Sequence, residues 1–267
     1  MSDEPSSTDA AWQDLRAFTR ARIALGRSGQ AQRTADVLAF GVDHALARDA
    51  VHLPLDEAAL RAELQAEGFA TLSVHSAAPD RARYLMRPDL GRRLDAASVA
   101  ALQACTAAAD TVAIDLLPVI GDGLSALGVQ RYGVAVLRAL RECAGPALRL
   151  GPVVIARQAR VALGDEIGER LRARAVVMLI GERPGLSSPD SLGLYLTWAP
   201  QLGRSDAQRN CISNVREQGL APAEAARKLL WLLREAARLG ESGVRLKDRS
   251  EGALVPDGAG PAAPRLG

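Results

Sequence analysis

A short loop carries the residues best suited to bind a ligand. It is the segment Gly181-Glu-Arg-Pro-Gly185, and it follows the apolar run Ala175–Ile180. An uninterrupted apolar run is typical of a strand buried on both faces of a parallel sheet, and open α/β sheets bind ligands at the carboxyl ends of such strands. Glu182 would present an acceptor and Arg183 a forked donor in fixed directions. The loop could therefore bind a ligand, but Pro and Gly are also typical of a plain turn, and a plain turn is the favoured interpretation of the loop taken alone.

A second turn, Gly121-Asp-Gly-Leu-Ser-Ala-Leu-Gly128, follows a predicted strand over 111–120. Its glycine spacing is G-x-G-x-x-x-x-G, which departs from the G-x-G-x-x-G of dinucleotide-binding folds. The chain has no G-x-x-x-x-G-K-[ST] phosphate loop, and Ser125 lacks the G-x-S-x-G frame of a nucleophile elbow. The free amides of this turn could contact a polar ligand group or cap the next helix, and the structural role is the favoured interpretation.

Three further candidates follow other predicted strands or lie in a polar segment. Arg160 and Val161 come after a predicted strand over 151–155, and Arg160 could pair with Glu169 at little energetic gain or donate to a ligand. Cys211 lies in Arg209–Asn214. No histidine is close to it in the sequence, which argues against a nucleophile. A small buried side chain and a contact with a cofactor edge both remain open for Cys211.

The elements that must position these residues fall into two regions. Helical spacing predicts helices over 14–25, 34–50, 56–66 and 96–109, with a short strand over 69–74. After Thr111 the chain alternates between strands over 111–120, 151–155, 174–180, 193–198 and 212–215 and helices over 124–143, 165–172 and 222–239. The alternation predicts an α/β fold, a Rossmann-like doubly wound parallel sheet preceded by a smaller, mainly helical N-terminal region. Pro118 does not suit a central strand, so either that strand starts late or its apolar run is altered.

The expected organisation has four parts. Residues 1–10 and 250–267 are predicted to be disordered tails, because both are polar or rich in Pro and Gly. Residues 11–109 form the mainly helical region, and residues 110–249 form the Rossmann-like domain.

Composition narrows the class of protein. Of the 267 residues 48% are hydrophobic but only 3% aromatic, so a large core of Ala, Val and Leu is expected. A net charge of +2 without a basic tract argues against a nucleic-acid-binding protein.

The three cysteines are an odd number without paired spacing, which favours a reducing compartment. No run is long enough to span a membrane, and the acidic N-terminus lacks the apolar core of a secretory signal. We therefore expect a cytoplasmic protein. His44, His52 and His75 have no zinc-site spacing, so no metal ligands are expected.

Several segments, taken in order, resemble the small subunit of ethanolamine ammonia-lyase, an adenosylcobalamin enzyme. The similarity covers about Leu15 to Lys247, nearly the whole chain. The matching segments are Ala21–Arg27, His44–Val51, Tyr84–Arg93, Asp122–Ser125, Ala159–Val161 with Gly164–Gly168, Gly181–Leu186 and Asn210–Asn214. Each is short, and their joint order and spacing are specific.

The resemblance implies a function that the motifs alone do not give. Enzymes of this family convert ethanolamine to acetaldehyde and ammonia, and their TIM-barrel large subunit carries the catalytic residues. The resemblance implies that this chain is the non-catalytic small subunit of a hetero-oligomer, which covers the corrin at the subunit interface. It implies cofactor contacts by Val161, Glu182 and Cys211, with Arg160 close by. The D-x-H-x-x-G signature of a cobalt-ligating histidine is absent.

Two other interpretations stay open at this point. One is a structural scaffold subunit without cofactor contact, and the other is a free-standing nucleotide enzyme, which the glycine spacing disfavours. Whether the complex is enclosed in a bacterial microcompartment is also left open by the resemblance.

Overall fold

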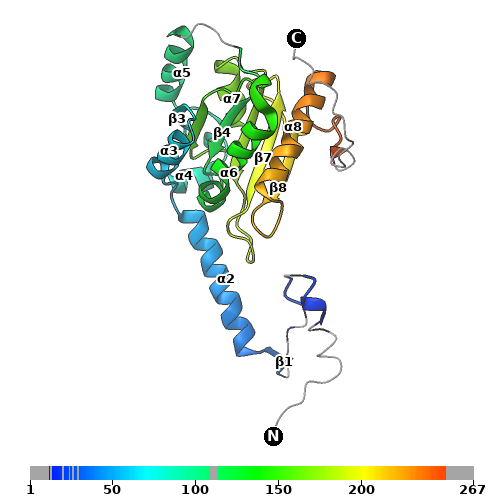
Figure 1. The fold of residues 1–267 in the computed structure, drawn as a ribbon. Helices are drawn as coiled ribbons and strands as arrows, with labels where there is room; N and C mark the ends of the chain where they lie inside the picture. The colour runs from blue at the N-terminus through cyan, green and yellow to red at the C-terminus, as the bar shows by residue number, and fades with distance from the viewer. Residues whose placement is uncertain are drawn as a thin grey trace.

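The computed structural model describes residues 12, 14–19, 21–23, 25, 27–28, 30–108 and 113–250. It consists of a sheet with helices on both faces and one long helix that projects away from this body (Figure 1). The tails predicted over 1–10 and 250–267 lie outside the described residues, except for Ser250. The predicted boundary near residue 110 also lies outside them, and the division into two regions stays a prediction.

The N-terminal part contains mainly helices. Its elements are β1 (Arg27–Ser28), β2 (Ala31–Gln32), α2 (Thr34–His52), α3 (Glu57–Ala66), β3 (Thr71–His75), α4 (Arg81–Met86), η1 (Leu90–Arg92) and α5 (Ala96–Ala108). The predicted helices over 34–50 and 56–66 and the strand over 69–74 are confirmed, and the helix over 96–109 is confirmed as far as Ala108, because residue 109 lies outside the described residues. Asp56 caps α3 by accepting from the Ala59 N–H at 3.0 Å. The short helix α4 was not predicted.

The predicted helix over 14–25 is wrong in its second half. Among the described residues the helical conformation ends at Arg16, and turns follow at Ala17 and Phe18. The reason is that this segment finds no apolar surface to pack against, since Phe18 is 88% exposed. A short helix without tertiary packing is only marginally stable in water.

The second part alternates as predicted. Its elements are β4 (Leu117–Gly121), α6 (Ala126–Ala144), η2 (Gly145–Ala147), β5 (Val153–Arg157), α7 (Leu163–Arg170), β6 (Ala175–Gly181), β7 (Leu192–Trp198), η3 (Asp206–Gln208), β8 (Arg209–Val215) and α8 (Pro222–Leu239). Of the two explanations for Pro118, the late start is right. It is the second residue of β4, and the ladder of β4 with β5 begins only at Val119.

The sheet is mixed, which corrects the prediction of a parallel sheet. Its six strands lie in the order β3-β5-β4-β6-β7-β8. The first four are mutually parallel, β7 is antiparallel to β6, and β8 is antiparallel to β7. Only the residues 182–191 connect β6 to β7, and this link is too short for the crossover that parallel neighbours need. The last two strands therefore return as hairpins.

Helices cover both faces of this sheet. The direction in which successive strands are added along the sheet reverses beside β4. Apolar residues of α3, α6 and α8 pack in one core cluster, and those of α5 and α7 pack in another. The connection from β4 to β5 thus uses one face and the connection from β5 to β6 uses the opposite face. Ligands of open α/β sheets bind at the carboxyl ends of the strands next to such a reversal. We call the side on which β3, β5, β4 and β6 end the carboxyl edge.

Helix α2 extends from the body as an arm (Figure 1). Leu38, Val42 and Leu46 recur every fourth residue and are 65%, 59% and 54% exposed. This spacing places them on one side of the helix, and we call them the exposed stripe. Ala50, near the end of α2, is buried, so the body holds the arm by its C-terminal end. Within the described chain no helix is both long and apolar enough to cross a membrane.

Candidate functional site

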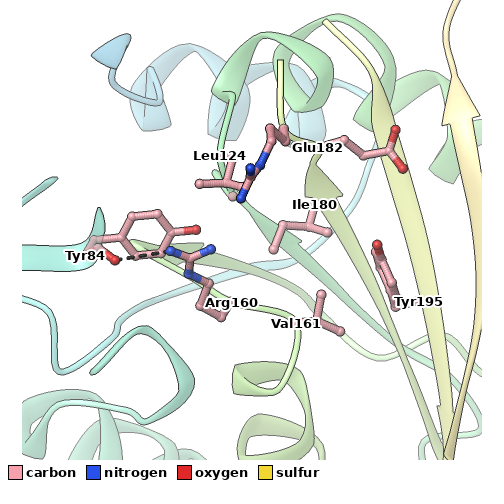
Figure 2. A pocket seen from close by; sticks show the side chains of 10 residues that line it. Tyr84, Leu124, Arg160, Val161, Ile180, Glu182 and Tyr195 are labelled. Atoms are coloured by element: carbon pink, nitrogen blue, oxygen red, sulfur yellow. Dashed lines mark hydrogen bonds between the residues drawn. The ribbon is translucent and has the colours of Figure 1, made fainter. Parts of the chain in front are cut away.

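A cavity of about 440 Å³ lies at the carboxyl edge, where β4, β5 and β6 end (Figure 2). Its walls come from the turn after β4, the segment after β5, the end of β6 with the loop that follows it, one residue of α4 and one of β7. The lining residues are Tyr84, Gly123, Leu124, Arg160, Val161, Ile180, Gly181, Glu182, Arg183 and Tyr195. The predicted ligand-binding loop and two of the other candidates, Arg160 and Val161, therefore share one site.

Two glycines bring the ends of β4 and β6 together beneath this cavity. Gly123 has a φ of +59°, and a Cβ there would collide with the Gly181 carbonyl oxygen. A Cβ on Gly181 would collide in turn with the Ser125 carbonyl oxygen. The close approach lets the Leu124 N–H donate to Gly181 O at 2.9 Å. The Gly123 and Leu124 amides of the turn are thus bonded within the protein, and Leu124 offers its side chain to the cavity.

Arg160 is held by the segment that carries Tyr84. Its backbone N–H donates to Gly91 O at 2.8 Å, and its Nη2 donates to Tyr84 O at 3.3 Å. The guanidinium carbon lies 4.3 Å from the centre of the Tyr84 ring, a cation–π geometry that is visible in Figure 2. A pair with Glu169, one of the two alternatives for Arg160, is not found among the described residues, and that carboxylate accepts instead from the Leu202 N–H at 2.9 Å. The buried Arg160 Nε has no hydrogen-bond partner among the described residues.

Glu182 is half-buried at the rim of the cavity and anchored on one side. Its N–H donates to Ser191 O at 3.0 Å. The Ser191 hydroxyl donates to Oε2, and the Asn214 N–H donates to the same oxygen at 3.3 Å. Within the described structure both donors go to Oε2, so Oε1 keeps its capacity to accept from a ligand.

Cys211 does not line the cavity but lies beside a residue that does. It is the cross-strand partner of Tyr195 in the β7–β8 ladder, and it is exposed. Desolvation raises the pKa of the thiol, which a hydrogen bond with Tyr195 opposes and the nearby Glu182 charge reinforces. Desolvation, followed by Cys211 itself, also raises the pKa of the Tyr195 hydroxyl. Both groups therefore stay neutral at pH 7, and neither is a ready nucleophile.

Comparison with known proteins identifies the family. The family model described as ethanolamine ammonia-lyase light chain (EutC) matches residues 9–247. The chain belongs to this family. Curated proteins named ethanolamine ammonia-lyase small subunit are similar along nearly the whole length. The Ralstonia nicotianae protein is 54% identical over 264 residues, 97% of each chain. The Pseudomonas aeruginosa protein is 56% identical over 247 residues, 92% of this chain and 90% of that one.

Membership in the ethanolamine ammonia-lyase small-subunit family confirms the assignment drawn from the short segments. The structure adds lining residues that the sequence interpretation did not single out as site residues, namely Tyr84, Leu124, Ile180 and Tyr195. A usable signal existed for two of them. Tyr84 opens one of the matching segments, and Tyr195 is one of the two aromatic residues of strand β7 (Leu192–Trp198), the other being Trp198 at its end.

Proposed function

We propose that this chain is the non-catalytic small subunit of an adenosylcobalamin-dependent ethanolamine ammonia-lyase and that its carboxyl edge covers part of the cofactor. The observation that supports this most directly is the cavity. Three of the four residues expected to contact cobalamin, Arg160, Val161 and Glu182, line it, and Cys211 pairs with the lining residue Tyr195.

The chemistry of the cavity wall fits a corrin. A corrin presents a broad apolar macrocycle with amide side chains that both donate and accept hydrogen bonds. Leu124, Val161 and Ile180 offer apolar contact, Glu182 Oε1 offers an acceptor, and Arg160 has a buried Nε donor without a partner among the described residues. A buried donor of this kind normally has a partner, and a ligand amide carbonyl would supply one.

In this proposal the chain's residues bind and shield. Adenosylcobalamin, when bound, supplies the radical chemistry, and the protein contributes placement and exclusion of solvent. The lining residues contain one carboxylate, Glu182, and no histidine, so the wall does not offer the pair of tuned groups expected of an acid–base site. The residues that bind and convert ethanolamine are therefore assigned to a large subunit, for which we expect a TIM barrel.

The size of the cavity supports a shared site. The cavity of about 440 Å³ is as large as a pocket for a drug-sized molecule, which holds about 300–1,000 Å³. Unlike a pocket that buries most of its ligand, it opens at the sheet edge. A whole cobalamin exceeds it, so a second protein must cover the rest.

The four parallel strands with helices on opposite faces also lead us to place the core of the sheet in the Rossmann-like, doubly wound class.

The arm offers a surface for the large subunit. The exposed stripe of α2 places three aliphatic side chains in solvent, which is typical of a helix that packs on a partner. The arm is also tied to the site, because Arg81 Nε donates to Val51 O at the end of α2 at 2.7 Å and Arg81 Nη1 donates to Gly123 O at 2.8 Å.

The decisive experiment measures cyanocobalamin binding by the complex of this chain with its matching large subunit. Glu182→Ala should weaken binding by about tenfold or more, since a hydrogen bond to a charged group is lost, and Arg160→Ala should weaken it similarly. Neither change should reduce co-purification of the two subunits. If both variants keep the wild-type dissociation constant, the chain is a scaffold subunit without cofactor contact. Ammonia release from ethanolamine by the isolated chain with cofactor would contradict the non-catalytic role.

A further inference from the structure

We propose that Asp122 is a positioning residue of this site, one that sets the distance between two walls of the cavity without touching the ligand. The inference rests on the proposed function, because it takes the cavity as the cobalamin site. Asp122 is 5% exposed and does not line the cavity. It follows β4 directly, at the start of the turn that provides one wall.

The carboxylate of Asp122 joins the end of β4 to the segment after β5. Oδ1 accepts from the Gly123 N–H at 3.0 Å and from the Ala159 N–H at 2.9 Å. Oδ2 accepts from the Gln158 N–H at 2.9 Å and lies 3.9 Å from Arg81 Nη1. One buried side chain therefore holds two consecutive amides of a neighbouring strand end.

The segment held in this way is the one that delivers Arg160 and Val161 to the cavity. It leaves β5 with an unusual conformation, since Gln158 has a φ of +51°, which a non-glycine residue adopts at a cost. The two bonds to the carboxylate stabilise that conformation. On the other side of the segment, the Tyr84 hydroxyl donates to Ala159 O at 3.0 Å. Ala159 is thus fixed at both its N–H and its C=O, immediately before Arg160.

The same carboxylate also orients the opposite wall. Gly123 donates its N–H to Asp122 and accepts from Arg81 through its carbonyl, which fixes the turn that carries Leu124. Three amides and a guanidinium thus converge on one group that does not line the cavity. Loss of one carboxylate oxygen would loosen both walls, and a binding site is sensitive to shifts of this kind.

The test uses Asp122→Asn in the complex with the large subunit, with cyanocobalamin as the probe. The amide keeps the size but replaces one acceptor oxygen by a donor, which would face an N–H. We expect the dissociation constant to rise by about tenfold, as for the loss of a hydrogen bond to a charged group. The matched control is Asp115→Asn, an equally buried aspartate at the other end of β4. It should lower the unfolding midpoint without changing the dissociation constant.

A double-mutant cycle distinguishes positioning from a general loss of stability. If Asp122 acts in part through the placement of Arg160, the substitution should weaken binding less in the Arg160→Ala background than in the wild type, because coupled residues are not additive. Fully additive effects, or an unchanged dissociation constant in Asp122→Asn, would overturn the inference.

A gentler variant keeps the inference testable if Asp122→Asn does not fold. Tyr84→Phe retains the ring beneath Arg160 and removes only the hydroxyl that holds Ala159 O. It should raise the dissociation constant by about threefold to tenfold, in keeping with one neutral hydrogen bond, and a wild-type value would count against positioning. If Arg160→Ala and Glu182→Ala weaken binding while Asp122→Asn and Tyr84→Phe do not, this inference fails and the proposed function stands. If none of the four weakens binding, the proposed function itself fails.

Discussion

The two ends of strand β4 carry buried aspartates with opposite surroundings. Asp115 precedes the strand and is 2% exposed, and Asp122 follows it and is 5% exposed. Asp115 accepts from Arg149 Nε at 2.9 Å and Nη2 at 3.0 Å, from the Arg149 backbone N–H at 3.1 Å and from Arg174 Nη1 at 3.3 Å. Asp122 instead accepts from three backbone amides. Two guanidinium groups therefore dominate the hydrogen bonds of Asp115, whereas backbone amides supply those of Asp122.

The two ends of β4 also differ in the buried polar atoms that lack a hydrogen-bond partner. Around Asp122, the buried atoms Arg81 Nη2, Gln158 Oε1 and Arg160 Nε lack a partner among the described residues. No such atom belongs to Asp115, Arg149 or Arg174. Buried polar groups without partners are uncommon in folded proteins. The side chains of Arg149 and Arg174 are 48% and 33% exposed, so water can reach them, whereas the carboxyl end keeps buried hydrogen-bonding capacity for something outside the chain.

The largest effect is expected from adding a side chain at the point where the ends of β4 and β6 approach each other. In Gly181→Ala the new Cβ would collide with Ser125 O, a backbone atom that cannot move aside easily. Overpacking of this kind costs about 3 kcal/mol, so the urea midpoint should fall and cobalamin binding should be lost with it. Gly41→Ala is the control, because nothing lies within 4 Å of its added Cβ. If both variants unfold at the wild-type urea concentration, the two strand ends are not as closely packed as described.

The next effect concerns the surface outside the carboxyl edge. Replacing Leu38, Val42 and Leu46 together by Ser should weaken association with the large subunit by about 2 kcal/mol, the level of an interface hot spot. The isolated chain should unfold as the wild type does, because these side chains are already exposed. Arg48→Ser, on another side of α2, serves as the control. Co-purification and sedimentation of the mixed subunits give the result, and an unchanged affinity in the triple variant would exclude the arm from the interface.

A smaller effect tests the amino end. Burial raises the pKa of Asp115, but hydrogen bonds from Arg149 and Arg174 outweigh it, and the pKa lies below the ordinary value of 3.8. A lowered pKa means that the ionised form stabilises the folded state above that value and that this contribution is lost as the pH falls through the folded-state pKa. Asp115→Asn should therefore lower the free energy of unfolding at pH 7 by about 2 kcal/mol.

The pH dependence of this difference gives the check. Unfolding curves of the wild type and Asp115→Asn should begin to converge below about pH 4, and they should approach each other further as the pH falls through the lowered folded-state pKa and the wild-type carboxyl becomes neutral. A difference that stays constant between pH 7 and pH 3 would show that the ionised carboxylate is not what stabilises this end of the sheet.

The sequence predicted which segments lie at the carboxyl edge better than it predicted how their strands pair and which distant residues reach the cavity. Local patterns suffice for a buried strand followed by Glu182 and for the helix 222–239, whose first and last residues agree with α8. They do not show which strands pair, and so they miss the antiparallel β6–β7 pair that the short link over 182–191 connects. Tyr84 could not be placed either, because it reaches the cavity through contacts with residues 75 and 76 positions away. Such contacts depend on the tertiary fold and not on local spacing.

The smallest effect is expected at Cys211, the cross-strand partner of the cavity residue Tyr195. Cys211→Ser conserves the size of an exposed side chain, so stability should change by less than about 0.5 kcal/mol and turnover of the complex should be retained. Because desolvation raises the pKa of the thiol, its alkylation by iodoacetamide should be slow at pH 7 and accelerate as the pH rises, since only the thiolate reacts. Cobalamin bound beforehand should slow that reaction further, while the helix cysteines Cys105 and Cys143 should react at the same rate with or without it. Loss of turnover in Cys211→Ser at normal cofactor affinity would instead mean that the sulfur takes part in the chemistry, and the carboxyl end would then do more than bind and shield.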